Sequence, residues 1–273
     1  MMTNTSAEFA ALKARLKATW MAGDFGQIAQ YSEAAAEQFI ARRAITSGMR
    51  VLDVACGTGN LAIPAAKAGA IVTGADIAPN LLEQARARAK REGVHVQFDE
   101  GDAEQLPYPD AAFDLVISKC GAMFAPRPER AAAELVRVCR HGGHIAMANW
   151  TPRGFIGQMF TVTGAHVPPP PGVPSPVLWG DEATVRERLR DGIAHLQLTS
   201  VMTALQYPFS VPETVEFFRR YYGPTQRAFA ALPEDKQPSL RGDLEHFWAQ
   251  HNQATDGTTH VEAEYLEVVA RRA

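Results

Sequence analysis

The sequence has 273 residues, of which 46% are hydrophobic and 21% are charged, and its 27 Lys and Arg against 30 Asp and Glu leave a formal net charge of −3. This composition excludes disordered, collagen-like and coiled-coil proteins, and the slightly acidic balance argues against a nucleic-acid or anionic-membrane binder. The length suits one large α/β domain, or a core with a small cap.

The chain carries no sequence signal for export or for a membrane span. Its first ten residues lack the basic and apolar segments of a signal peptide, and no stretch approaches the roughly 20 apolar residues that cross a bilayer. The three cysteines, Cys56, Cys120 and Cys139, form no C-x-x-C pattern and are odd in number, so neither a disulfide framework nor a zinc ribbon is predicted. We therefore expect a soluble, cytoplasmic protein with reduced thiols.

Residues 1–49 are predicted to be helical. Apolar residues recur at helical spacing up to Trp20, and a Gly-Asp-Phe-Gly break at residues 23–26 separates them from a second apolar run. Trp20 stands directly before this break, where the end of a helix can fold over a bound ligand. We expect two N-terminal helices ahead of the core.

Residues 50–150 have the pattern of an α/β core, in which short apolar runs alternate with longer, alanine-rich charged segments. Strands are predicted at residues 50–54, 71–76, 94–98, 113–118 and 144–149, and helices at 60–68, 79–91 and 127–139. Such alternation is typical of right-handed strand-helix-strand units and therefore of a mostly parallel sheet.

After residue 150 the alternation stops and a cap is predicted. Six of the ten residues 167–176 are proline, which favours a stiff loop over a pocket rather than a docking motif for a partner domain. A helix at 181–190, a strand at 196–209, helices at 212–222 and 240–250, and a last strand at 260–269 follow. The predicted regions are the N-terminal helices (1–49), the α/β core (50–150), a cap or substrate region that includes a core helix and strand (151–259), and a final core strand (260–273).

The densest motif is the strand at residues 51–54 followed by a glycine turn that opens a helix. Gly57 and Gly59 allow the backbone to approach a ligand closely, and the free N–H groups at a helix start attract negative charge. Gly57-x-Gly59-x-x-Ala62 also fits the relaxed dinucleotide fingerprint. An NAD(P)-dependent oxidoreductase is therefore one alternative.

Three acids bear on the choice of cofactor, and two of them, Asp53 and Asp102, discriminate. Asp53, inside the first strand, would repel a pyrophosphate but would hold a ligand ammonium group. Asp76 ends the second strand and suits a ribose in either class of site. Asp102, after the third strand, is placed to contact an adenine edge. Together they favour a nucleotide cofactor that carries an amino-acid moiety.

With these landmarks, residues 50–149 resemble the class I S-adenosylmethionine-dependent methyltransferases, and they are similar to bacterial quinone-biosynthesis methyltransferases. The matching features are the loop at 53–59, Asp76, the segment 101–103 with Leu-Pro-Tyr at 106–108, the strand 113–118, and a helix ending before a Gly-Gly pair at 142–143. The resemblance implies a doubly wound, mostly parallel seven-stranded sheet of Rossmann-like type with N-terminal helices and a helical, proline-rich cap.

The resemblance also implies methyl transfer from S-adenosylmethionine, with a set of cofactor-binding residues: Asp53, Ala55, Cys56, Gly57, Gly59, Asn60, Asp76, Ile77, Asp102, Ala103, Ser118 and Lys119. Cys56 departs from the glycine common at its position, and His141 from a proline. The Asn/Asp-Pro-Pro-Tyr signature of enzymes that methylate amino groups of bases is absent at residues 118–121, which argues against a nucleic-acid substrate.

A small, hydrophobic or aromatic acceptor is expected, because the cap is rich in aromatic residues. No catalytic residue is predicted, since a sulfonium donor needs a base only when the nucleophile must lose a proton; His166 is the histidine we would test as one. No metal site or oligomeric state is predicted. A non-catalytic cofactor-binding protein whose proline loop docks a partner is a second alternative. The candidate substrate residues are Cys120, Trp150, Phe155, Met159, His166, Trp179, Tyr221 and Tyr222.

Overall fold

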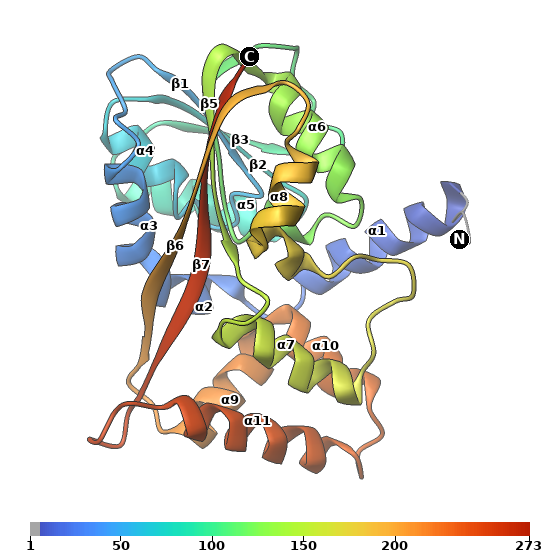
Figure 1. Cartoon of the computed structure of the whole chain (residues 1–273). Helices are drawn as coiled ribbons and strands as arrows, with labels where there is room; N and C mark the ends of the chain where they lie inside the picture. Colours follow the sequence, from blue (N-terminus) through green and yellow to red (C-terminus); the bar gives the residue numbers. More distant parts are fainter. Residues whose placement is uncertain (1–5) are drawn as a thin grey trace.

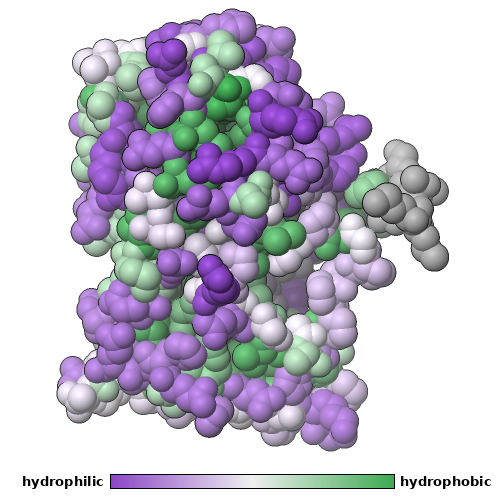
Figure 2. All heavy atoms as spheres, viewed as in Figure 1, coloured by the Kyte–Doolittle hydropathy of each residue, from purple (hydrophilic) through white to green (hydrophobic). Residues whose placement is uncertain are grey.

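The computed structural model describes residues 6–273; the first five residues of the predicted N-terminal region lie outside them. One half of the molecule is a twisted sheet with helices on both faces, and the other half is a group of helices (Figure 1). Two long strands run from the first half into the second. Hydrophilic side chains cover most of the same face, with hydrophobic ones visible between them (Figure 2).

The described residues form a seven-stranded sheet in the order β3-β2-β1-β4-β5-β7-β6. The first five strands of this order are parallel, whereas β7 runs antiparallel to both β5 and β6. Both faces of the central strands are buried, as is typical of parallel sheets. The predicted fold class is therefore confirmed. The strands are β1 (Arg50–Val54), β2 (Ile71–Asp76), β3 (Val96–Glu100), β4 (Phe113–Lys119), β5 (Cys139–Trp150), β6 (Ile193–Tyr207) and β7 (Thr259–Arg272).

Helices cover the two faces of the sheet and enclose two apolar cores. On one face, α3 (Glu33–Ala41), α4 (Ala62–Lys67) and α5 (Pro79–Arg91) contribute buried residues such as Phe39, Ile63 and Leu82. On the other face, α6 (Pro128–Val138), the 3-10 helix η3 (Pro176–Gly180) and α8 (Glu182–Arg188) contribute Leu135 and Trp179. This arrangement is a doubly wound sheet.

A third apolar core lies in the helical half, between helices and the far ends of β6 and β7. Its centre is aromatic: the ring of Phe155 lies 4.9 Å from that of Phe247 and 4.7 Å from that of Trp248, between ring centroids. The long strands β6 and β7 therefore belong both to the sheet and to the core of the helical half. The helices are α7 (Phe155–His166), α9 (Val211–Tyr221), α10 (Gly223–Ala231) and α11 (Gln237–His251).

The N-terminal residues form three helices rather than the two predicted: α1 (Ser6–Trp20), α2 (Phe25–Ala29) and α3, with a 3-10 turn, η1 (Gln30–Ser32), before α3. Asp24 explains why a separate helix begins at Phe25: its carboxylate accepts a hydrogen bond from the backbone N–H of Gly26 and so caps the N-terminus of α2. Within residues 6–273, no helix is both long and apolar enough to cross a membrane.

In the core, the strands predicted at 50–54 and 71–76 and the helix predicted at 79–91 have the predicted bounds. The third strand starts two residues late, at Val96, because Gly93 adopts a left-handed conformation (φ 70°) and the N–H of Val94 donates to the carbonyl of Ala89. These residues complete the exit from α5. β5 starts early, at Cys139, because the glycines at 142–143 lie in an irregular stretch of the strand rather than in a turn before it.

After the α/β core, two helices were not predicted, α7 and α10. α7 contains Gly157 and Gly164, which disfavour a helix, but its buried face packs against α11 and β7. α10 begins with Gly223 and Pro224, which resemble a turn; the proline lies in the first helical turn, where its missing N–H is not needed.

Candidate functional site

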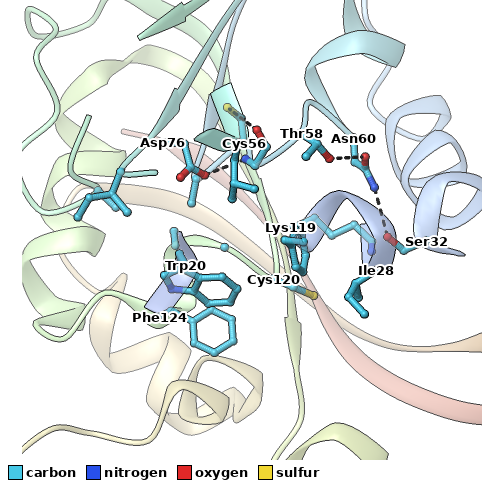
Figure 3. A pocket seen from close by; sticks show the side chains of 18 of the residues that line it. Trp20, Ile28, Ser32, Cys56, Thr58, Asn60, Asp76, Lys119, Cys120 and Phe124 are labelled. Atoms are coloured by element: carbon cyan, nitrogen blue, oxygen red, sulfur yellow. Dashed lines mark hydrogen bonds between the residues drawn. The ribbon is translucent and has the colours of Figure 1, made fainter. Parts of the chain in front are cut away.

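A cavity lies at the carboxyl ends of β1, β2, β4 and β5, next to the point where the strand order reverses between β1 and β4. Ligands bind at this position in open α/β sheets. Polar residues such as Asp76, Thr58 and Asn60 line one side of it, and Trp20, Phe124 and Ile28 lie on the opposite side (Figure 3). The cavity thus has a polar half and an apolar half.

The loop after β1 forms the polar wall. Ala55, Gly57 and Gly59 all have positive φ angles, of 56°, 54° and 83°, so the backbone curls tightly, and Ala55 and Gly57 line the cavity. Asp53 anchors this loop: its side chain is 1% exposed and its Oδ2 accepts a hydrogen bond of 3.0 Å from the N–H of Ala62. Burial raises the pKa of Asp53 well above its ordinary value, and the nearby charge of Asp76 adds to the rise.

Asp76, at the end of β2, holds the same loop from the other side. Its Oδ2 accepts from the N–H of Gly57 at 2.8 Å and its Oδ1 from the N–H of Ala78 at 2.9 Å. Burial raises the pKa of Asp76, and these amide bonds partly oppose the rise. Asp53 and Asp76 are buried carboxylates that face the cavity, and each keeps lone pairs available to a ligand.

The third predicted acid, Asp102, is engaged by the N-terminal helix. The ammonium group of Lys13, in α1, pairs with Asp102 and lies 2.7 Å from Oε2 of Glu104. Glu104 also pairs with Arg127, and the carboxylate of Asp102 accepts from the N–H of Glu104 at 2.9 Å. These ion pairs hold α1 against the segment that follows β3, at one side of the cavity.

Lys13 was not predicted to be a site residue. Lys13, Leu16 and Trp20 all line the cavity, and they are spaced three and four residues apart on one face of α1. The signal that could have identified Lys13 is its place on the apolar face of a predicted helix, the face that also carries Trp20. Trp20 itself was singled out in the sequence, and it lines the cavity.

The apolar half is lined by aromatic and aliphatic side chains from several elements. The ring of Trp20 lies 4.9 Å from that of Phe124 and 6.1 Å from that of Tyr222, between centroids. Burial raises the pKa of Cys120 to about 11 and also raises the pKa of Tyr222 and Tyr207. Thiols and phenols are already protonated at neutral pH, and the raised pKa values keep these groups from accepting a proton there.

Ten of the twelve predicted cofactor residues line the cavity, and Gly59 and Ser118 do not. The hydroxyl of Ser118 donates to the carbonyl of Val54 at 2.7 Å and accepts from the N–H of Ala122 at 3.0 Å. Ser118 therefore joins β4 to β1 beneath the cavity. The lining residues are Asp53, Ala55, Cys56, Gly57, Asn60, Asp76, Ile77, Asp102, Ala103 and Lys119.

Of the eight predicted substrate residues, Cys120, Trp150, Met159 and Tyr222 line the cavity, and the other four lie elsewhere. α7 turns Ile156 and Met159 toward the cavity and Phe155 into the helical core. Trp179 is fully buried on the far face of the sheet.

The remaining two, Tyr221 and His166, are also outside the cavity. The ring of Tyr221 packs against that of Phe217, with centroids 5.0 Å apart. Nε2 of His166 lies 2.7 Å from Oδ2 of Asp243, so His166 is not placed to act as a base in the cavity. The proline-rich residues 167–176 form a mostly exposed loop, and the expectation that this loop covers the cavity is wrong, because none of its residues lines it.

Comparison with known proteins gives a consistent picture. Residues 52–147 match the model of a family described as a methyltransferase domain. An uncharacterized protein of Mycobacterium tuberculosis is 36% identical over 263 residues, which cover 96% of this chain and 95% of that protein. A demethylmenaquinone methyltransferase of Thermus thermophilus is 40% identical over 124 residues, 44% of this chain and 56% of that protein.

Among solved structures, YcgJ of Bacillus subtilis is similar in fold. The two structures superimpose with a TM-score of 0.60 at 19% sequence identity, covering 88% of this chain and 98% of that one. A similarity at 19% sequence identity supports the assignment of the fold only.

Proposed function

We propose that this chain, a member of the S-adenosylmethionine-dependent methyltransferases, methylates a small apolar or aromatic molecule bound in the apolar half of its cavity. The division of the cavity into a polar and an apolar half carries this proposal. The family membership decides against the NAD(P)-dependent oxidoreductase and favours an enzyme over a non-catalytic binding protein.

The polar half fits the cofactor. Asp53 and Asp76 are buried carboxylates whose hydrogen-bond partners are backbone N–H groups, and a ligand ammonium and ribose hydroxyls would complete their bonding. In the proposed arrangement Asp53 binds the methionine ammonium, Asp76 the ribose, and Asp102 with Ala103 the adenine. Asp102 would have to share its carboxylate between Lys13 and the adenine.

The apolar half supports the choice of acceptor. When bound, the cofactor supplies a methyl group already activated on a sulfonium sulfur. The protein therefore has to orient a nucleophile and exclude water, which the rings of Trp20, Phe124 and Trp150 are placed to do. The polar groups among them, Cys120 and Tyr222, have ordinary pKa values above neutral pH, and burial raises these pKa values further, so both groups are protonated. We assign no general base.

Calorimetric titration with S-adenosylmethionine, S-adenosylhomocysteine, NAD and NADP tests the cofactor site. We expect micromolar binding of the two adenosyl-sulfur compounds and none of the nicotinamide cofactors. Production of S-adenosylhomocysteine over a panel of aromatic, aliphatic and polar acceptors tests the second half of the proposal. Turnover confined to polar acceptors or nucleic acids would contradict it.

We also propose that the protein is cytoplasmic. Support comes from its cysteines: Cys56, Cys120 and Cys139 are all free thiols, none of them fully exposed. Unpaired thiols of this kind are typical of a reducing compartment.

A substitution at Gly121 tests the packing of the cofactor loop. A Cβ atom there would lie 2.6 Å from the carbonyl oxygen and 2.7 Å from Cβ of Ala55, which already has a left-handed backbone. Gly121→Ala is expected to weaken S-adenosylhomocysteine binding and to lower the free energy of unfolding by about 1–3 kcal/mol, because the contact is with backbone that cannot rotate away.

The matched control is Gly164→Ala in α7, where an added Cβ would meet no atom within 4 Å. Its binding should equal that of the wild type, and its stability should rise by roughly 0.5–1 kcal/mol because alanine favours a helix. Thermal unfolding and titration measure both. Equal affinities in the two variants would show that the loop does not depend on the approach of Gly121.

A further inference from the structure

Two cations line the cavity, and they differ in their surroundings. Lys13 is paired with the carboxylates of Asp102 and Glu104. Lys119, at the end of β4, has no carboxylate within ion-pair distance among the described residues, and its Nζ instead lies 5.9 Å from the centroid of the Trp150 ring. Its side chain extends into the cavity toward the side where Ile28 and Ser32 lie (Figure 3).

The apolar half offers Lys119 no counter-charge. An ammonium group among aromatic and aliphatic side chains is costly unless it is paired, and a single tryptophan face compensates only in part. The nearby ionisable groups, Cys120, Tyr207 and Tyr222, have pKa values raised by burial, so they carry no negative charge at neutral pH. An anionic group of a molecule bound in the cavity would supply this counter-charge.

We propose that Lys119 binds an anionic oxygen of the methyl acceptor, which makes the acceptor an apolar acid: a carboxylate or an acidic phenol. This inference rests on the proposed function. Its location supports it, because Trp150, the aromatic neighbour of Lys119, belongs to the apolar half together with Ile156 and Met159. The ammonium group thus selects the charge of the acceptor, and the surrounding rings select its apolar body.

Binding of the anion also explains how transfer proceeds without a base. The acceptor loses its proton to water before it binds, so its oxygen arrives with a free electron pair. That pair forms the new oxygen–carbon bond to the methyl group, the carbon–sulfur bond breaks, and its electrons remain on sulfur, which becomes a neutral thioether. No protein group has to take up a proton, in agreement with the protonated state of Cys120 and Tyr222.

The test compares acids with their neutral amides on protein saturated with S-adenosylhomocysteine. The probes are 2-naphthoate with 2-naphthamide, and octanoate with octanamide. At least one acid should bind the wild-type protein ten- to a hundredfold more tightly than its amide, as expected for a charge-assisted hydrogen bond. Lys119→Met should lose this preference, and Lys119→Arg should keep it. No preference in the wild type, or the same preference in Lys119→Met, would overturn the proposal.

A second titration separates the acceptor from the cofactor as the source of the anion. S-adenosylhomocysteine carries a carboxylate, whereas 5′-methylthioadenosine does not. If Lys119→Met weakens binding of the first tenfold and leaves the second unchanged, the ammonium binds the cofactor and the proposal is wrong. We expect S-adenosylhomocysteine to bind the wild type and Lys119→Met with the same affinity, and we expect the same of 5′-methylthioadenosine. Failure of the wild type to bind S-adenosylhomocysteine at all would instead refute the proposed function.

Discussion

An Asp53→Asn variant is expected to bind S-adenosylmethionine at least tenfold more weakly than the wild type and, without ligand, to unfold at a higher temperature. The carboxylate is 1% exposed and accepts a hydrogen bond from the N–H of Ala62. The amide oxygen of asparagine can keep that bond, but it cannot pair with a ligand ammonium group. Loss of a charge-assisted hydrogen bond costs about 1.5–3 kcal/mol, or ten- to a hundredfold in affinity.

The gain in stability follows from the direction of the pKa shift. Burial raises the pKa of Asp53 in the folded protein, whereas the unfolded chain has the ordinary value. The folded state therefore binds more protons between these two pKa values, and its stability falls as the pH rises through that window. Asparagine has no proton to lose, so the variant should be more stable than the wild type at neutral pH and should lose this advantage as the pH falls toward the ordinary pKa of aspartate.

The same shift predicts the pH dependence of binding. The cofactor ammonium pairs with the ionised carboxylate, so the affinity of the wild type should fall as the pH drops through the raised pKa of Asp53. 5′-Methylthioadenosine, which lacks the ammonium, should be much less affected. Calorimetry from pH 8 to pH 5 and thermal unfolding without ligand measure the two effects. A variant that is less stable than the wild type, or that binds equally well, would remove Asp53 from the proposed site.

Much of the polar half of the cavity was predictable from the sequence because it depends on local patterns. Asp53 and Asp76 lie on neighbouring parallel strands, and the carboxyl ends of such strands meet at one edge of the sheet. The glycine turn fixes the intervening loop. Once the strands were assigned, the position of these side chains in space followed.

The apolar half was predicted less well because it depends on which face each helix presents. Phe155 and Trp179 were chosen for their aromatic side chains, but both are buried in apolar cores. Ile156, which lines the cavity, was passed over because α7 itself was not predicted. An aromatic residue near a pocket is as often part of the core as of the lining, and only the packing of the helix decides.

The contacts of α1 could not be predicted from the sequence, for a different reason. Lys13 and Asp102 are separated by 89 residues, and no periodicity relates them. Their pairing depends on the angle at which α1 crosses the edge of the sheet, which packing in the helical half determines. Glu104 belongs to the same cluster of ion pairs.

Glu104→Ala is expected to destabilise the protein and to loosen α1 from the cavity. Its side chain is fully buried; its carboxylate lies 2.7 Å from the ammonium of Lys13 and accepts at 2.6 Å from both the backbone N–H and Nε of Arg127. Removing one partner of a buried ion pair costs about 3–5 kcal/mol. Because Lys13 and Arg127 remain 20% and 26% exposed, they can turn to water, and we expect the cost to be nearer 2–3 kcal/mol.

The functional effect should be larger than this loss of stability alone explains, because α1 carries Lys13, Leu16 and Trp20 to the cavity. Below the unfolding temperature, Glu104→Ala should bind S-adenosylhomocysteine more weakly, while Glu104→Gln, which still accepts from Arg127, should fall between it and the wild type. Glu83→Ala, at an exposed position of α5, is the control and should change stability by less than about 0.5 kcal/mol. If Glu104→Ala unfolds and binds like this control, the position of α1 beside the cavity depends on its apolar contacts and not on its ion pairs.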